Sequence, residues 1–120
     1  MSNSVLRDKS FNFAVEIVNL SHFLQNERRE FILSKQVLRS GTAIGAIISE
    51  AEYAQSHADF ISKLSIALKE TNETVYWLKL LYETKYIDND IFEKLISKNK
   101  ELLAMLVSSI KTSKSKQAER

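Results

Sequence analysis

The chain contains no cysteine and no proline, and only two of its 120 residues are glycine. The absence of cysteine excludes disulfide bonds, cysteine-based zinc sites and thiol nucleophiles. Sandwich and α/β folds usually place glycine or proline in their frequent turns, so neither fold class is favoured. No stretch of the sequence is apolar enough to span a membrane, and no signal peptide is visible. We therefore expect an all-α domain in the cytoplasm, with no membrane partner.

Four segments carry apolar residues at alternating spacings of four and three, a pattern typical of helices packed in a bundle. The predicted core positions are Leu6, Ser10, Phe13, Ile17, Leu20 and Leu24; Leu33, Val37, Ser40, Ile44, Ile47, Ala51 and Ala54; Phe60, Leu64, Ala67, Thr71, Thr74, Leu78 and Leu81; and Phe92, Ile96, Asn99, Leu103, Leu106 and Ile110. Short breaks between the segments favour antiparallel neighbours. The sequence thus predicts an up-down-up-down antiparallel four-helix bundle over residues 1–111, followed by a basic, frayed tail at residues 112–120.

Polar residues mark the expected breaks near residues 25–26, 55–57 and 86–90. Asn26 is the predicted N-cap of the second helix, and Glu30 is expected in its first turn. Ser56 is the predicted N-cap of the third helix, with Asp59 three residues later as in a capping box. Asp90 and Glu93 have the same spacing and are expected to begin the fourth helix.

Both glycines, Gly41 and Gly45, lie inside the predicted second helix. Glycine in a helix interior costs up to about 1 kcal/mol relative to alanine, so its presence needs a reason. The residues around them are also small, which favours a smooth face on which another helix packs closely. Local mobility or a ligand contact with the backbone is the alternative interpretation.

The third segment, residues 60–81, carries more apolar surface than one face of a bundle helix needs. Some of this surplus can contact the two flanking helices, and the remainder predicts a self-association surface. Trp77 is its expected anchor because protein interfaces favour tryptophan and tyrosine. The predicted interface residues are Ile66, Tyr76, Trp77 and Leu80.

No constellation of catalytic or metal-binding residues is present. A di-iron bundle needs Glu-x-x-His on two helices, but neither His22 nor His57 has a glutamate three residues before it. Glu70 and Glu73 lie three apart near Trp77, where an apolar ring could raise a carboxylate pKa. No nucleophile or phosphate-binding loop accompanies them, so ion pairs with basic residues of other helices are the favoured interpretation. We predict no catalytic residue, no metal site and no cofactor.

The formal net charge of +2 is unevenly distributed. Residues 111–120 sum to +3 and residues 1–110 to −1, so the body is nearly neutral and the tail is basic. A second basic group falls in the first half of the predicted second helix. Such groups can bind nucleic-acid phosphates, although solvated helix surface is the more common meaning. The candidate nucleic-acid contacts are Arg28, Arg29, Lys35, Arg39, Lys111, Lys114 and Lys116.

The run from Leu38 to Ala46, followed by Glu50 and Ala51, resembles the second-helix signature of the rRNA intervening-sequence protein family. The similarity continues through residues 59–61, 63–64, 66–70, 73–74 and 76–78. This resemblance implies a four-helix bundle that assembles into a ring, typically a pentamer. It also implies distant kinship with accessory variability proteins of retroelements, which bind nucleic acid and a reverse transcriptase. One departure is Ile47, which stands where the family pattern usually has asparagine, and we expect it to replace a polar core contact with apolar packing.

These observations favour a non-enzymatic, ring-forming scaffold or adaptor. Its expected partners are further copies of itself and, through phosphates, RNA or DNA. The alternative is a protein-only adaptor that docks another protein on the oligomer.

Overall fold

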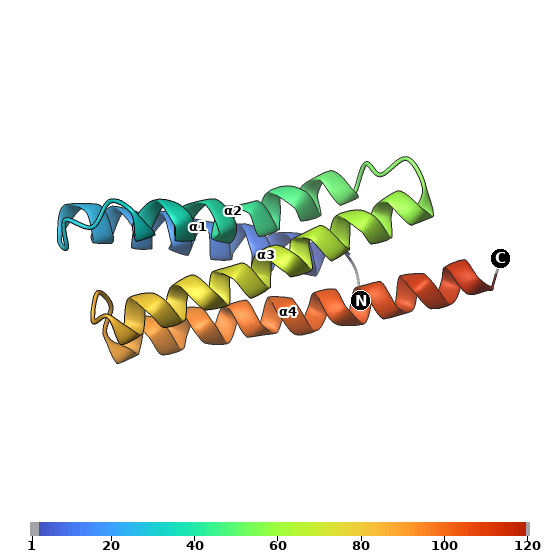
Figure 1. Cartoon of the computed structure of the whole chain (residues 1–120). Helices are drawn as coiled ribbons and strands as arrows, with labels where there is room; N and C mark the ends of the chain where they lie inside the picture. Colours follow the sequence, from blue (N-terminus) through green and yellow to red (C-terminus); the bar gives the residue numbers. More distant parts are fainter. Residues whose placement is uncertain (1–2, 120) are drawn as a thin grey trace.

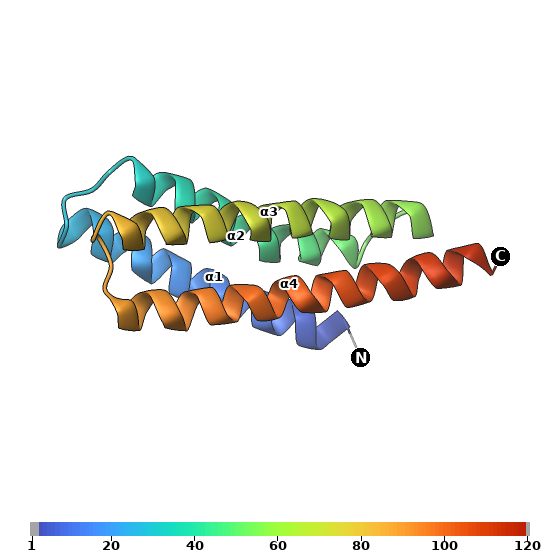
Figure 2. The same cartoon turned by 60° about the horizontal axis from the view of Figure 1, so that its bottom comes forward.

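The computed structural model describes residues 3–119. Its four helices are α1 (Asn3–Asn26), α2 (Leu33–Ala51), α3 (His57–Glu83) and α4 (Asn89–Ala118). They run alternately up and down in an elongated bundle of 53 × 22 × 19 Å (Figures 1 and 2). α2 packs against α1 and α3, while α4 packs closely on α3 and more loosely on α1, so α1 and α3 occupy diagonal corners. The predicted all-α four-helix bundle is confirmed.

The buried faces follow the predicted core positions with small shifts. All six predicted positions of α1, from Leu6 to Leu24, are buried. Two predicted core positions are displaced by one residue. Ile48 is buried in place of Ile47 in α2, and Leu102 is buried in place of Leu103 in α4. Ile47 and Leu103 are half-buried instead. The core-facing stripe of a helix is about 100° wide, so at one step either of two consecutive residues can occupy it, and the predicted lines are buried again at Ala51 and Leu106.

The start of α2 differs from the prediction. Asn26 is the last residue of α1, and residues 27–32 form a loop. The carboxylate of Glu30, still in this loop, accepts hydrogen bonds from the backbone N–H groups of Ile32, Leu33 and Ser34 at 3.2, 3.0 and 2.8 Å. Glu30 therefore satisfies the free N–H groups at the start of α2, a role that was wrongly expected of Asn26.

The other two helix starts are capped by side chains. The Ser56 hydroxyl accepts a hydrogen bond from the backbone N–H of Asp59 at 3.0 Å, which confirms the predicted N-cap of α3. In α4 the cap is Asp88, whose carboxylate accepts from the backbone N–H of Ile91 at 2.9 Å. Asp90, the expected cap, lies instead in the first turn, where its charge interacts favourably with the helix dipole.

The C-terminal segment is helical as far as Ala118, so the expected fraying from residue 112 is wrong for the described residues. Ser113 is buried, and its carbonyl oxygen accepts a hydrogen bond from Nε2 of His57 at 2.6 Å. This contact holds the last turns of α4 against the beginning of α3. It joins residues far apart in the sequence, so the polar composition of residues 112–120 does not indicate it.

The two glycines of α2 lie where α1 makes its closest approach. A Cβ atom at Gly41 would lie 2.8 Å from both Cγ atoms of Ile17. A Cβ atom at Gly45 would lie 3.1 Å from the backbone carbonyl oxygen of Ser10. Close contact between α1 and α2 therefore depends on the absence of side chains at both positions.

Candidate functional site

An apolar surface lies on the outer side of α3. Tyr76 is 59% exposed, and Ile66 is also exposed. Trp77 and Leu80 are half-buried, and Trp77 packs against the core. The Trp77 ring meets the Tyr76 ring edge-on, with 5.0 Å between the centroids. Tyr76, Trp77 and Leu80 thus lie close together on α3, while Ile66 lies about 15 Å from Tyr76 along the helix axis. Tyr76 presents more surface to solvent than the expected anchor Trp77.

A second apolar surface lies on α1 and was not among the predicted sites. Phe11 is 66% exposed, and the exposed Val15 lies four residues further along the same face. Neither residue belongs to the core line of α1. The sequence does contain an indication of this surface. Phe11 and Val15 are apolar residues four apart, and neither is needed for the core line of this helix, which other residues fill.

Glu70 and Glu73 form a charged cluster between α2 and α3. Nη1 of Arg39 lies 3.5 Å from Oε1 of Glu70, and Nη2 of Arg39 pairs with Oε2 of Glu73. Nε1 of Trp77 donates a hydrogen bond to the same Glu73 oxygen at 3.1 Å. Both hydrogen bonds lower the pKa of Glu73, and the one from Trp77 has the larger effect. The expected ion pairs of these acids with a basic residue of another helix are present. A general acid needs a raised pKa, whereas the pKa of Glu73 is lowered.

We expect this lowered pKa to make stability depend on pH. The ionised form of Glu73 stabilises the fold above the ordinary glutamate pKa of 4.5, and this contribution is lost as the pH falls through the lower pKa of the folded state. Acid unfolding followed by the fluorescence of the single tryptophan should therefore shift in Glu73→Gln, with a smaller dependence of stability on pH below 4.5. Glu70→Gln serves as the control, and an equal effect of both variants would contradict the assignment to Glu73.

The candidate basic residues near α2 do not form a free cluster. The sequence wrongly predicted Arg28 and Arg29 to lie in the second helix; they lie in the loop before α2. Nη2 of Arg28 donates a hydrogen bond to the carbonyl oxygen of Lys85 at 3.1 Å, and its guanidinium lies over the Tyr86 ring. Arg39 is paired with two carboxylates, as described above. Of this group, Arg29 and Lys35 have exposed side chains that make no ion pair among the described residues.

The candidate basic residues of α4 lie at the other end of the molecule. Lys111, Lys114 and Lys116 are exposed on the last turns of α4. The loop that carries Arg28 and Arg29 lies at the opposite end of the bundle (Figure 1). The seven candidate contacts therefore form two separate sets, and the structure does not bring them into a single patch.

Residues 3–119 contain no cluster of three or more histidine, aspartate or glutamate residues placed to hold a metal ion. Within the same residues, no helix has a stretch long and apolar enough to cross a membrane.

Comparison with known proteins gives one family. The family model for the 23S rRNA-intervening sequence protein matches residues 2–108. A crystal structure of a protein with unknown function from the S23 ribosomal protein family of Bacteroides thetaiotaomicron VPI-5482 is similar, with 58% sequence identity and a TM-score of 0.91. The alignment covers 92% of this chain and 99% of that one. No protein with a curated description matches the chain significantly. Neither the family nor the relative carries a description as an enzyme.

Proposed function

Because the chain belongs to the 23S rRNA-intervening sequence protein family, as the resemblance of its second and third helices predicted, we propose that it is a non-enzymatic scaffold. In this proposal several copies, with five favoured, assemble into a ring in the cytoplasm, and the ring binds nucleic acid through phosphates. The observation that carries the proposal is the presence of two separate exposed apolar surfaces, on α1 and on α3.

A ring needs two different contact surfaces on each subunit, because a head-to-tail interface joins one surface to a different one on the next copy. Phe11 and Val15 of α1 form one candidate surface, and Ile66 and Tyr76 of α3 form the other. These helices occupy diagonal corners of the bundle, so both surfaces can be used at once. Large exposed aromatic residues also suit interface anchors, because they bury much area with little loss of side-chain entropy.

Nucleic-acid binding is supported by the lysines at the end of α4. Lys111, Lys114 and Lys116 are exposed and make no ion pair within residues 3–119. A ring would repeat this set in every subunit and so concentrate positive charge that a single chain lacks. Arg28, Arg29 and Lys35 form the second candidate set, although Arg28 is engaged with Lys85 and Tyr86. The resemblance to retroelement accessory variability proteins favours the same class of partner.

Neutralising the α4 lysines is expected to weaken binding to RNA or DNA and to reduce its dependence on salt. We expect the slope of log affinity against log salt to fall by about 1 for each of the three lysines that contacts a phosphate. The variant is Lys111→Gln, Lys114→Gln, Lys116→Gln, titrated with short RNA and DNA duplexes at several salt concentrations. Lys69→Gln, Lys79→Gln, Lys100→Gln removes the same number of exposed lysines, which make no ion pair among the described residues and belong to neither candidate set, and is the matched control. Binding that is absent in the native protein, or insensitive to salt, would contradict the proposal.

The second candidate function is a protein-only adaptor. The exposed apolar surfaces on α1 and α3 favour it equally, because they also suit contacts with another protein. It predicts a stoichiometric protein partner in the purified complex and no salt-dependent affinity for nucleic acid. The two functions are therefore separated by the same titration.

A further inference from the structure

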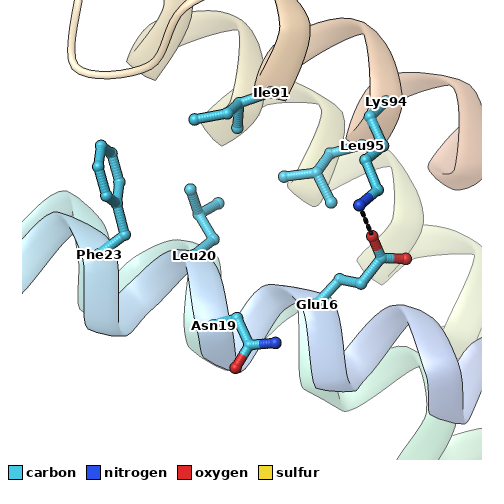
Figure 3. Close-up of a pocket in the computed structure, with 7 residues that line it drawn as sticks. All are labelled: Glu16, Asn19, Leu20, Phe23, Ile91, Lys94 and Leu95. Atoms are coloured by element: carbon cyan, nitrogen blue, oxygen red, sulfur yellow. Dashed lines mark ion pairs between the residues drawn. The ribbon is translucent and has the colours of Figure 1, made fainter.

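A cavity of about 300 Å³ opens between α1 and α4, the most loosely packed pair of neighbouring helices. Figure 3 shows Leu20 and Phe23 of α1 facing Ile91 and Leu95 of α4 across this cavity. Asn19 lies at its margin, and the pair of Glu16 and Lys94 stands at one end. The lining is therefore apolar over most of its length and charged at one end, which is the usual arrangement of a small-molecule site.

The charged end carries more positive than negative charge. A single carboxylate, that of Glu16, pairs with two lysines, with Oε1 3.1 Å from Nζ of Lys94 and Oε2 2.5 Å from Nζ of Lys98. The neighbouring pair of Lys9 and Glu101, 3.2 Å apart, is balanced. The two lysines beside Glu16 thus share one carboxylate. Lys98 lies outside the cavity lining and can keep the pair with Glu16, while Lys94 lines the cavity and, with a side chain 63% exposed, can turn toward a ligand.

The state of Glu16 agrees with this excess of positive charge. Partial burial by itself would raise the pKa of Glu16, but hydrogen bonds from Lys98 and Lys94 outweigh that effect and hold the pKa below its ordinary value. Glu16 is therefore ionised at neutral pH and competes with any ligand anion for the two lysines.

We propose that the cavity between α1 and α4 binds a small apolar carboxylate, whose hydrocarbon part lies among Leu20, Phe23, Ile91 and Leu95 and whose carboxylate pairs with Lys94. The volume is at the lower end of the range for ligand sites, which favours a medium-chain carboxylate over a larger amphiphile. The lining residues of α1, from Glu16 to Phe23, extend about 10 Å along the helix axis, which suits a chain of the length of octanoate. The cavity contains none of the exposed residues Phe11, Val15, Ile66 and Tyr76, so the inference does not depend on the proposed ring.

The test is a titration of the full chain with octanoate, followed by backbone amide NMR and by the shift in melting temperature. Octanoate should perturb the amides around Leu20, Phe23, Ile91 and Leu95, and the uncharged octanol should bind more weakly. Lys94→Gln should weaken octanoate binding by about fivefold, the effect of one partly exposed ion pair. Glu16→Gln should strengthen it by a similar factor, since it releases Lys94 from competition.

Lys63→Gln is the matched control, because Lys63 also pairs with one carboxylate, that of Glu50 at 3.3 Å, but is not among the residues that line the cavity. It should leave octanoate binding unchanged. Ile91→Trp should fill the cavity and abolish binding, and its melting curve reports whether the variant folds. The proposal is overturned if octanoate does not perturb the lining residues, if octanol binds as tightly, or if Lys94→Gln and Glu16→Gln change affinity in the same direction.

Discussion

A valine in place of Gly41 is expected to lower the free energy of unfolding by about 2–3 kcal/mol, the cost of severe overpacking. Even the first atom of the new side chain would lie 2.8 Å from Cγ1 and Cγ2 of Ile17, closer than carbon atoms pack in proteins. Ile17 is fully buried and branched at Cβ, so it has few alternative rotamers into which it can move. α1 must therefore shift away from α2. Urea unfolding followed by circular dichroism, at one fixed protein concentration, measures the effect.

Two further variants separate overpacking from helix propensity. Ala46→Val places the same side chain on the exposed side of α2 and should cost less than about 1 kcal/mol. Ile17→Ala removes the atoms with which the new valine collides, so the double variant should be more stable than the sum of the single effects by about 1–3 kcal/mol. Additive effects would show that Gly41 matters for some reason other than its contact with Ile17.

The regular parts of the bundle could be predicted because each core line repeats one simple spacing. All six predicted core residues of α1 are buried, and the line of α3 is nearly as accurate. The errors at Ile47 and Leu103 are shifts of one residue to Ile48 and Leu102. They arise because the core-facing stripe of a helix is about 100° wide, so that either of two consecutive residues can occupy it at one step.

The loops could not be predicted with the same accuracy because their chemistry is unusual. Arg29 and Lys85 have φ angles of 56° and 67°, a region where glycine or asparagine is the ordinary choice. Polar residues near Asn26 and Asp88 indicate that the helices break there, but without glycine or asparagine at these two positions nothing in the local sequence indicates the turn conformations. The hydrogen bond from Arg28 to the Lys85 carbonyl oxygen joins these two loops. It is a tertiary contact that no local pattern indicates.

The candidate interaction surfaces could be predicted only in part. The sequence predicted an apolar excess on α3, and Ile66 and Tyr76 are indeed exposed. It did not predict the surface of Phe11 and Val15, because an apolar residue beside a core line is either half-buried, as Val18 is, or exposed. Only the positions of the neighbouring helices decide between these two outcomes. For the basic residues, their charge could be read from the sequence, but their separation into two sets toward opposite ends of the bundle could not (Figure 1).

Aspartate at either apolar surface is expected to convert the proposed ring into monomers of 13.8 kDa. Phe11→Asp places a charge in the α1 surface, and Tyr76→Asp places one in the α3 surface. A charge buried in an apolar interface without a partner costs several kcal/mol, which exceeds the contribution of most single interface residues. Light scattering combined with size-exclusion chromatography should therefore show a loss of the oligomer in each variant, with unchanged helix content by circular dichroism.

Mixing the two variants gives the sharpest test of head-to-tail assembly. Phe11→Asp retains an intact α3 surface, and Tyr76→Asp retains an intact α1 surface, so the mixture can form one native interface but cannot extend it. The expected product is a heterodimer, which neither variant forms alone. Tyr53→Asp is the matched control, because Tyr53 is an exposed aromatic residue just after α2 and outside both surfaces, and this variant should keep the native mass. If the interface instead joined two identical α3 surfaces, Phe11→Asp would leave the native mass unchanged and the mixture would contain no heterodimer. Those results would exclude a ring built through α1 and α3.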